Sequence, residues 1–115
     1  MRICPRCGAD LTAFNEDDYT VKLIAALRHP EPFTQRRAAY VLGLRRDGRA
    51  VAALIEAMDS SADVYVRGEA AAALGKIGGP QAEAALRRVL ADRRASAVLR
   101  RAATDALAQI TSGEG

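Results

Sequence analysis

One stretch of this sequence occurs twice. The segment VRGEAAAALGKI at residues 66–77 is followed, at an offset of 33, by LRRAATDALAQI at residues 99–110, with apolar, Arg, Ala and Leu characters in register. An earlier segment, RRAAYVLG at residues 36–43, matches residues 68–75 at an offset of 32. Repetition with a period in the thirties is typical of helical solenoids, whose units bury their apolar faces against one another. We therefore expect a stack of similar units.

Each unit divides into two helices. Val66, Ala70 and Leu74 fall on one helical face, because their spacing follows the period of 3.6 residues per turn. Helix-breaking residues separate the predicted helices. For example, Gly78 fits the end of one helix, and Pro80 fits the first turn of the next. Short connections make neighbouring helices antiparallel, so we predict an all-α, short right-handed α-solenoid of helical hairpins. The predicted helices, about six in number, span residues 17–28, 33–44, 48–58, 63–77, 80–91 and 97–111.

The length and composition fit this architecture. A chain of 115 residues forms one domain, and its apolar half contains few aromatic residues (4%) and no Trp. Alanine and leucine therefore carry the hydrophobicity, which favours closely packed helices over sheets. We expect a non-helical head at residues 1–13, a repeat domain at 14–111 and a flexible tail at 112–115.

The repeated pattern has a family resemblance. Asp59, Val66-Arg67, Ala70, Leu74 and Ile77, with the same spacing repeated from Asp92, resemble HEAT-like repeats. The resemblance is strongest to the short Ala-rich bacterial type, which is also found in phycobilisome lyase subunits, and it covers roughly residues 17–111. The first register is looser because Gln35 replaces the Arg.

The resemblance implies structural roles for the repeated Asp and Arg residues, as ladders between repeats and as caps of helix ends. Asp63 is favourable near a helix N-terminus, whereas Arg67 and Arg100 are not. These two arginines therefore need an acidic or carbonyl partner, and ligand binding is the alternative role.

The resemblance also implies protein–protein interaction without catalysis, on a concave face lined by the second helix of each repeat. We assign that face to the helices at 17–28, 48–58 and 80–91; an ordinary solvated helix face is the alternative. The candidate partner-binding residues are Lys22, Arg49, Glu56, Gln81 and Arg88. No enzyme is expected, because the single His29 supports no catalytic triad and the chain has no Gly-rich phosphate loop.

Nucleic-acid binding is the alternative function. The net charge is +3 and the isoelectric point about 9.2. Against this function, acidic residues share the basic edge, and no aromatic residues interleave for base stacking. The edge lies where each helix at 17–28, 48–58 or 80–91 leads into the next, and its arginines are Arg36, Arg37, Arg67, Arg93, Arg94, Arg100 and Arg101.

The head contains Cys4-Pro5-Arg6-Cys7-Gly8, which resembles a zinc knuckle of the zinc-ribbon type. Cys4 and Cys7 supply only half of a four-ligand zinc site. Two chains could share one site in a homodimer, or Cys4, Cys7, His29 and Asp10 could form a single-chain set. A zinc-ribbon remnant and a redox dithiol are the other readings.

The sequence also bears on location. No run approaches the roughly 18 apolar residues of a membrane span. The first residues carry no apolar signal region, and closely spaced cysteines without one indicate a reducing compartment. We therefore predict a cytoplasmic protein.

Overall fold

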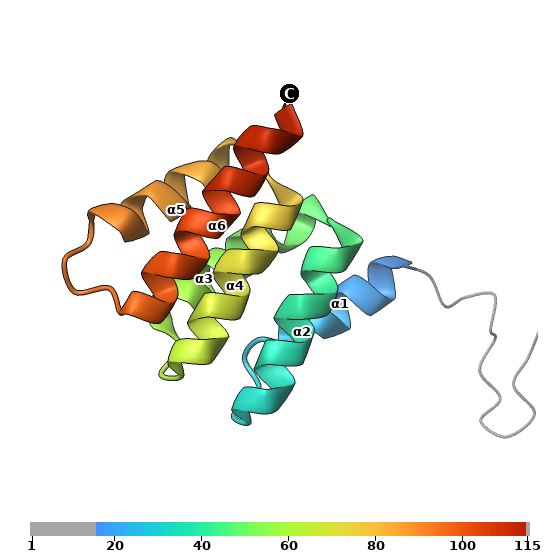
Figure 1. Ribbon diagram of the computed structural model, residues 1–115. Coiled ribbons are helices and arrows are strands. Elements are labelled where there is room, and N and C mark those ends of the chain that lie inside the picture. Colours follow the sequence, from blue (N-terminus) through green and yellow to red (C-terminus); the bar gives the residue numbers. More distant parts are fainter. Residues whose placement is uncertain (1–15, 115) are drawn as a thin grey trace, which may run out of the picture.

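The computed structural model describes residues 16–114, with side chains for residues 19–111, so the predicted head at 1–13 lies outside the described residues. Every element within this range is helical (Figure 1). All six predicted helices are present, each within three residues of its predicted ends. They are α1 (Glu16–Ala26), α2 (Pro32–Arg45), α3 (Val51–Ser60), α4 (Val64–Ile77), α5 (Pro80–Ala91) and α6 (Ala97–Glu114), with a 3-10 turn η2 (Gly48–Ala50) before α3.

The last helix is longer than predicted. α6 runs to Glu114, whereas the sequence analysis ended it at residue 111 and placed a tail at 112–115. Ile110 is buried, and the Thr111 hydroxyl donates to the Leu107 carbonyl at 3.0 Å. Packing and hydrogen bonding thus hold the helix up to residue 111, and no Pro follows to end it.

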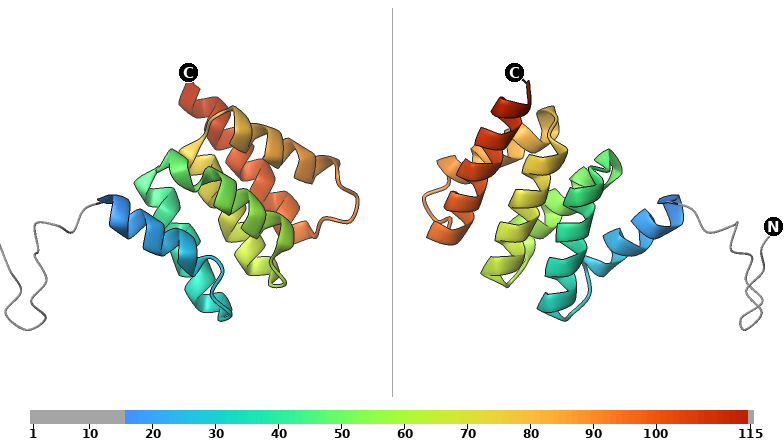
Figure 2. Two further views of the ribbon diagram at one scale, coloured as in Figure 1. Left: turned by 180° about the vertical axis from the view of Figure 1, so that it is seen from behind. Right: turned by 45° about the vertical axis from the view of Figure 1, so that its right-hand side comes forward.

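The helices form two layers (Figures 1 and 2). α2, α4 and α6 lie side by side in one layer, and α1, α3 and α5 lie behind them. Each pair of consecutive helices α1–α2, α3–α4 and α5–α6 is one hairpin. The core lies between the layers, where Leu42, Leu54, Leu74, Leu86 and Leu99 are almost fully buried. The structure is a short helical solenoid, as predicted.

The two layers differ in spacing. A Cβ on Gly43 would lie 2.9 Å from the Ala73 Cα, and a Cβ on Gly75 would lie 2.6 Å from the Ala106 Cα. α2, α4 and α6 therefore approach closely because these positions carry no side chain. By contrast, α1, α3 and α5 contact one another little, and a cavity of about 460 Å³ opens between α1 and the second hairpin. We call the closely spaced layer of α2, α4 and α6 the inner layer, and the more widely spaced layer of α1, α3 and α5 the outer layer.

The helix ends follow the predicted chemistry. Asp63 caps α4, because its carboxylate accepts from the Tyr65 and Val66 amides at 2.8 and 3.2 Å. At the other end of α4, Gly78 has φ +76°, and Pro80 begins α5. Gly78 and Gly79 alone therefore connect α4 to α5.

Candidate binding surfaces

One position in each repeat ties a hairpin together. The Arg67 guanidinium donates to the Met58 carbonyl at 2.7 Å, and Arg100 donates to the Asp92 carbonyl at 2.6 Å. Gln35, which occupies the same position in the first repeat, donates from its amide to the His29 carbonyl at 2.5 Å. All three side chains donate to backbone carbonyls in the last turn of the preceding helix or in the connection just after it. The prediction that Arg67 and Arg100 need an acidic or carbonyl partner is confirmed, the partners being carbonyls, and Gln35 makes the equivalent contact.

The five residues predicted to bind a partner share one layer. They lie on α1, on α3 with its preceding 3-10 turn η2, and on α5. This is the more widely spaced of the two layers. Helical periodicity identifies the exposed faces of these helices but does not say which layer packs more closely, and binding of a partner by these residues stays a prediction. The five residues are Lys22, Arg49, Glu56, Gln81 and Arg88.

Two of these residues form ion pairs between hairpins. Arg28 lies 3.3 Å from the Glu56 carboxylate, and Arg88 lies 2.7 Å from the Asp59 carboxylate. Both pairs bridge the gap between successive helices of the outer layer. The four side chains are 45–70% exposed, so each pair contributes at most about 1 kcal/mol. These charges are accessible to a partner but are already neutralised by their neighbours.

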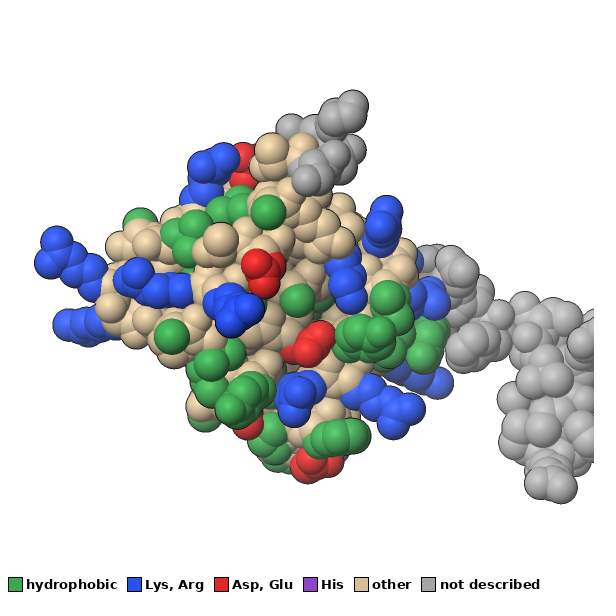
Figure 3. Space-filling model, viewed as in Figure 1, with side chains coloured by type: hydrophobic (Ala, Val, Ile, Leu, Met, Phe, Trp, Pro, Cys, Tyr) green, Lys and Arg blue, Asp and Glu red, His purple; other side chains and the backbone are tan. Residues whose placement is uncertain are grey.

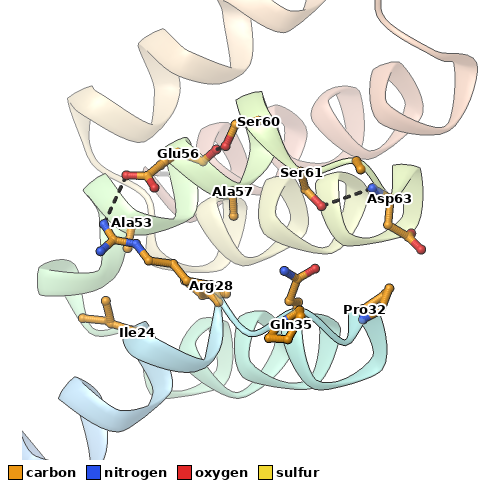
Figure 4. Close-up of a pocket in the computed structure, with 13 residues that line it drawn as sticks. Ile24, Arg28, Pro32, Gln35, Ala53, Glu56, Ala57, Ser60, Ser61 and Asp63 are labelled. Atoms are coloured by element: carbon orange, nitrogen blue, oxygen red, sulfur yellow. Dashed lines mark hydrogen bonds and ion pairs between the residues drawn. The ribbon is translucent and has the colours of Figure 1, made fainter.

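A groove of about 460 Å³ lies beside Glu56 (Figure 4). Ile24, Ala53 and Ala57 contribute apolar surface, and the Arg28–Glu56 pair lies at one end. At the other end, the Asp63 amide donates to the Ser61 hydroxyl. Its volume of about 460 Å³ is within the range of small-ligand sites, but its polar groups do not converge on one point.

The Asp47 carboxylate accepts hydrogen bonds from Thr20 on α1 and from Arg49 in η2. The hydroxyl of the buried Thr20 donates to it at 2.8 Å, which links α1 to the α2–α3 connection. Arg49 donates from its amide at 3.0 Å and from its guanidinium at 2.7 Å. These hydrogen bonds from Arg49 and Thr20 hold the pKa of Asp47 well below its usual range. Arg49, a predicted partner-binding residue, is therefore paired with Asp47, although its side chain remains 52% exposed.

A second surface was missed in the sequence analysis. Among the described residues, five of the seven exposed large hydrophobic side chains lie on α2, α4 and α6. The signal was present in the repeats, because three of the five occur at offsets of 32 and 33. The five, which we call the apolar inner face, are Phe33, Tyr40, Leu44, Tyr65 and Val98.

Cations surround the aromatic rings of this face. The Arg36 guanidinium lies 5.7 Å from the centre of the Tyr65 ring, and the Lys76 ammonium lies 4.5 Å from that of Tyr40. Figure 3 shows this side of the molecule, with hydrophobic side chains gathered over α2 among Lys and Arg side chains. A hollow of about 310 Å³ lies between α2 and α4, lined by Phe33, Arg36, Arg37, Tyr40 and Glu69.

The predicted arginine edge is only partly available for a ligand. Arg67 and Arg100 are committed to backbone carbonyls, as described above. Five of the seven arginines remain exposed, and Arg36 among them lies over an aromatic ring. The exposed arginines are Arg36, Arg37, Arg93, Arg94 and Arg101.

Cys4 and Cys7, the predicted metal ligands, lie outside the described residues. Within residues 16–114, no cluster of three or more His, Cys, Asp or Glu side chains has the arrangement to hold a metal ion. His29 accepts a hydrogen bond at Nδ1 from the Glu31 amide. No helix in the same range has the length and apolarity needed to span a membrane.

Comparison with known proteins identifies the repeat. A family model described as HEAT repeats matches residues 20–108. No match was found among curated proteins. The matched range covers most of α1 and extends into α6, so it includes both layers.

Proposed function

Because the chain belongs to the HEAT repeat family, we propose that it is a non-catalytic module that binds a partner protein on its inner face. HEAT repeats are commonly scaffolds for protein interaction, and catalysis is not typical of them. The observation that carries the choice of face is the distribution of exposed hydrophobic residues. The inner layer exposes five large ones, whereas the outer layer exposes only Val21 and Leu90 in the described part of the chain.

The apolar inner face has the composition of an interaction surface. Aromatic residues and arginine are enriched among the residues that dominate binding energies, and here Tyr65 and Arg36 lie against each other. Phe33 and Tyr65 are 64% and 58% exposed. Covering the exposed part of each would contribute roughly 1–2 kcal/mol, so the two residues together can supply a substantial part of a moderate affinity.

The test is a comparison of partner capture by matched variants. The tagged chain is incubated with lysate of its source organism, and bound proteins are quantified by mass spectrometry. Tyr65→Ala and Phe33→Ala should each reduce capture of the specific partner about tenfold or more. Val21→Ala is the control, because Val21 is 63% exposed but lies on the outer layer. Equal loss with Val21→Ala, or no loss with Tyr65→Ala, contradicts the proposal.

The outer layer is the second candidate surface for the same function. It carries the groove between α1 and the second hairpin, and Glu56 lies beside that groove. Glu56→Arg and Arg88→Glu reverse charges at two of the five predicted partner-binding residues. If these changes abolish capture while Tyr65→Ala leaves it intact, the partner binds on Lys22, Arg49, Glu56, Gln81 and Arg88 instead.

Nucleic-acid binding through the arginine edge is the alternative function, favoured by the five exposed arginines described above. It predicts a shift of DNA or RNA that weakens steeply with salt. A double substitution, Arg93→Ala with Arg94→Ala, should then weaken binding. Absence of any shift at low salt would exclude this function.

We also propose that Cys4 and Cys7 bind zinc as thiolates in a site shared between two chains, and that the protein acts in the cytoplasm. The support is the Cys-x2-Cys-Gly spacing, which matches one half of a tetrahedral zinc site. Native mass spectrometry should detect a zinc-containing dimer that becomes a monomer on Cys4→Ser. A metal-free monomer of the unmodified chain would contradict the shared site.

A further inference from the structure

Three exposed apolar residues of the inner face form a row. Phe33, Tyr65 and Val98 occupy equivalent positions near the start of α2, α4 and α6. Because these helices lie side by side, the row crosses the stack perpendicular to the helix axes (Figure 1). The exposed fractions of the three residues are 64%, 58% and 42%. A partner that contacts all three must run across the helices and not along one of them.

The spacing of the row restricts the shape of the partner. Packed helices lie about 8–10 Å apart. An extended polyproline II segment advances about 9 Å per turn of three residues, so every third side chain points the same way at nearly this distance. Side chains on one face of a β-strand lie only about 6.6–6.8 Å apart, and those on one face of a helix lie about 5.4 or 10.5 Å apart, so both match a spacing of about 8–10 Å less well. The row therefore fits a polyproline II segment with an apolar residue at every third position.

The charges beside the row restrict the composition of the partner. Arg36 and Arg37 lie next to Phe33, and Arg101 follows Val98 on α6. All three are exposed. Of the carboxylates near the row, Glu31 and Asp63 accept from the Phe33 and Tyr65 amides as helix caps, and Glu69 lines the hollow between α2 and α4. None of the side chains of Arg37, Arg101 and Glu69 makes an ion pair in the described part of the chain. Because Arg37 and Arg101 are exposed and make no ion pair in the described residues, an acidic segment would supply the carboxylates that pair with them.

We propose that the row of Phe33, Tyr65 and Val98 binds an extended acidic segment of a partner protein, with an apolar side chain at every third residue. The inference rests on the proposed function, because it names the partner of the same face. The apolar side chains lie on the three row residues. The acidic residues between them pair with Arg36, Arg37 and Arg101, and one carboxylate enters the hollow beside Arg37.

Fluorescence anisotropy with three labelled peptides tests the proposal on the full-length protein. The probe is (Leu-Pro-Glu)4. The second peptide is (Leu-Pro-Lys)4, which keeps the spacing and reverses the charge. The third has the composition of the probe with irregularly spaced leucines. The probe should bind at least about tenfold more tightly than either control peptide.

Variants then assign the binding to the row. Tyr65→Ala should weaken probe binding about tenfold, and Phe33→Ala by a similar factor, whereas Val21→Ala on the outer layer should leave it unchanged. The double variant Arg36→Glu with Arg37→Glu should lose the acidic probe and gain (Leu-Pro-Lys)4. All these positions are exposed, so each variant should keep the circular dichroism spectrum of the unmodified protein.

Several results would overturn the inference. These are equal binding of the acidic and basic peptides, equal binding of the irregular peptide, or no binding of the probe. If single-stranded oligo-dT displaces the probe, and Tyr65→Ala weakens the binding of oligo-dT, the row binds nucleic acid instead. If Tyr65→Ala abolishes partner capture while no peptide binds, the proposed function stands and only the chemistry of the partner is different.

Discussion

At the scale of single residues, the hairpins are held by side chains that satisfy the backbone. Gln35, Arg67 and Arg100 occupy one repeated position, and each donates to a backbone carbonyl in the last turn of the preceding helix or just after it. A positive charge near a helix N-terminus interacts unfavourably with the helix dipole. An arginine that recurs at this position therefore needs a compensating contact. The carbonyl bond supplies that contact, because helix C-terminal carbonyls otherwise lack partners.

This arrangement predicts how Arg67 responds to substitution. Arg67→Ala removes the donors to the Met58 and Asp59 carbonyls and should lower the free energy of unfolding by about 1–2 kcal/mol. Arg67→Gln should lose less, because Gln35 makes the equivalent bond in the first repeat. Urea denaturation of the three proteins measures the difference. An unchanged stability of Arg67→Ala would mean that Arg67 is available for a ligand.

Asp47 predicts a pH dependence of stability. Its pKa in the folded state lies below the usual value of 3.8, so the folded state favours the charged carboxylate. The resulting stability is fully present above the unfolded pKa and is lost as the pH falls through it toward the folded pKa. Asp47→Asn should therefore destabilise the protein by about 1 kcal/mol at pH 7 and by less at pH 3.

Urea denaturation of both proteins at pH 7, 5 and 3 measures this difference. Equal slopes of stability against pH in the two proteins would show that Asp47 makes no such contribution. Thr20→Val supplies a second check, because it removes one hydrogen bond from Asp47 while leaving Arg49 in place.

At the scale of helices, the repeated glycines fix the architecture. Gly43 and Gly75 stand at equivalent positions and let α4 approach α2 and α6 at backbone distance. Side chains at these positions would push the inner helices apart. The asymmetry between a close inner layer and an open outer layer follows from these two contacts.

Gly75→Ala tests this role. Its new methyl group would lie 2.6 Å from the Cα of Ala106, which is backbone and cannot rotate away. The free energy of unfolding should fall by about 1–3 kcal/mol. Gly48→Ala is the matched control, since a Cβ there meets no atom within 4 Å. Thermal denaturation distinguishes the two, and equal effects would show that the inner helices can separate without loss.

The helices themselves could be predicted from the sequence, because the breakers and the repeated apolar spacing are local signals. Pro80 and Gly78 mark their helix ends in the structure as they do in the sequence. The relative spacing of the two layers could not be predicted, because it depends on which faces meet across repeats. The candidate partner-binding residues were accordingly assigned to the more open layer.

At the scale of the whole molecule, the stacking of repeats brings residues that are distant in the chain together on one surface. Phe33, Tyr65 and Val98 are far apart in the chain and lie in one row because the repeats place them at equivalent positions. Few aromatic residues are present, and those on α2 and α4 are exposed and accompanied by cations. Exposed apolar patches on a protein surface typically mark interaction sites, which supports a binding role for this face.

The central claim is that the partner contacts the inner face. Site-specific photo-cross-linking tests it most directly, with p-benzoylphenylalanine placed at Tyr65 on the inner layer or at Gln81 on the outer layer. Both side chains are exposed near the start of their helices, so the two probes are comparably accessible. We predict a covalent adduct with the captured partner from Tyr65 and none from Gln81. An adduct from Gln81 alone would contradict the claim and place the partner on the outer layer.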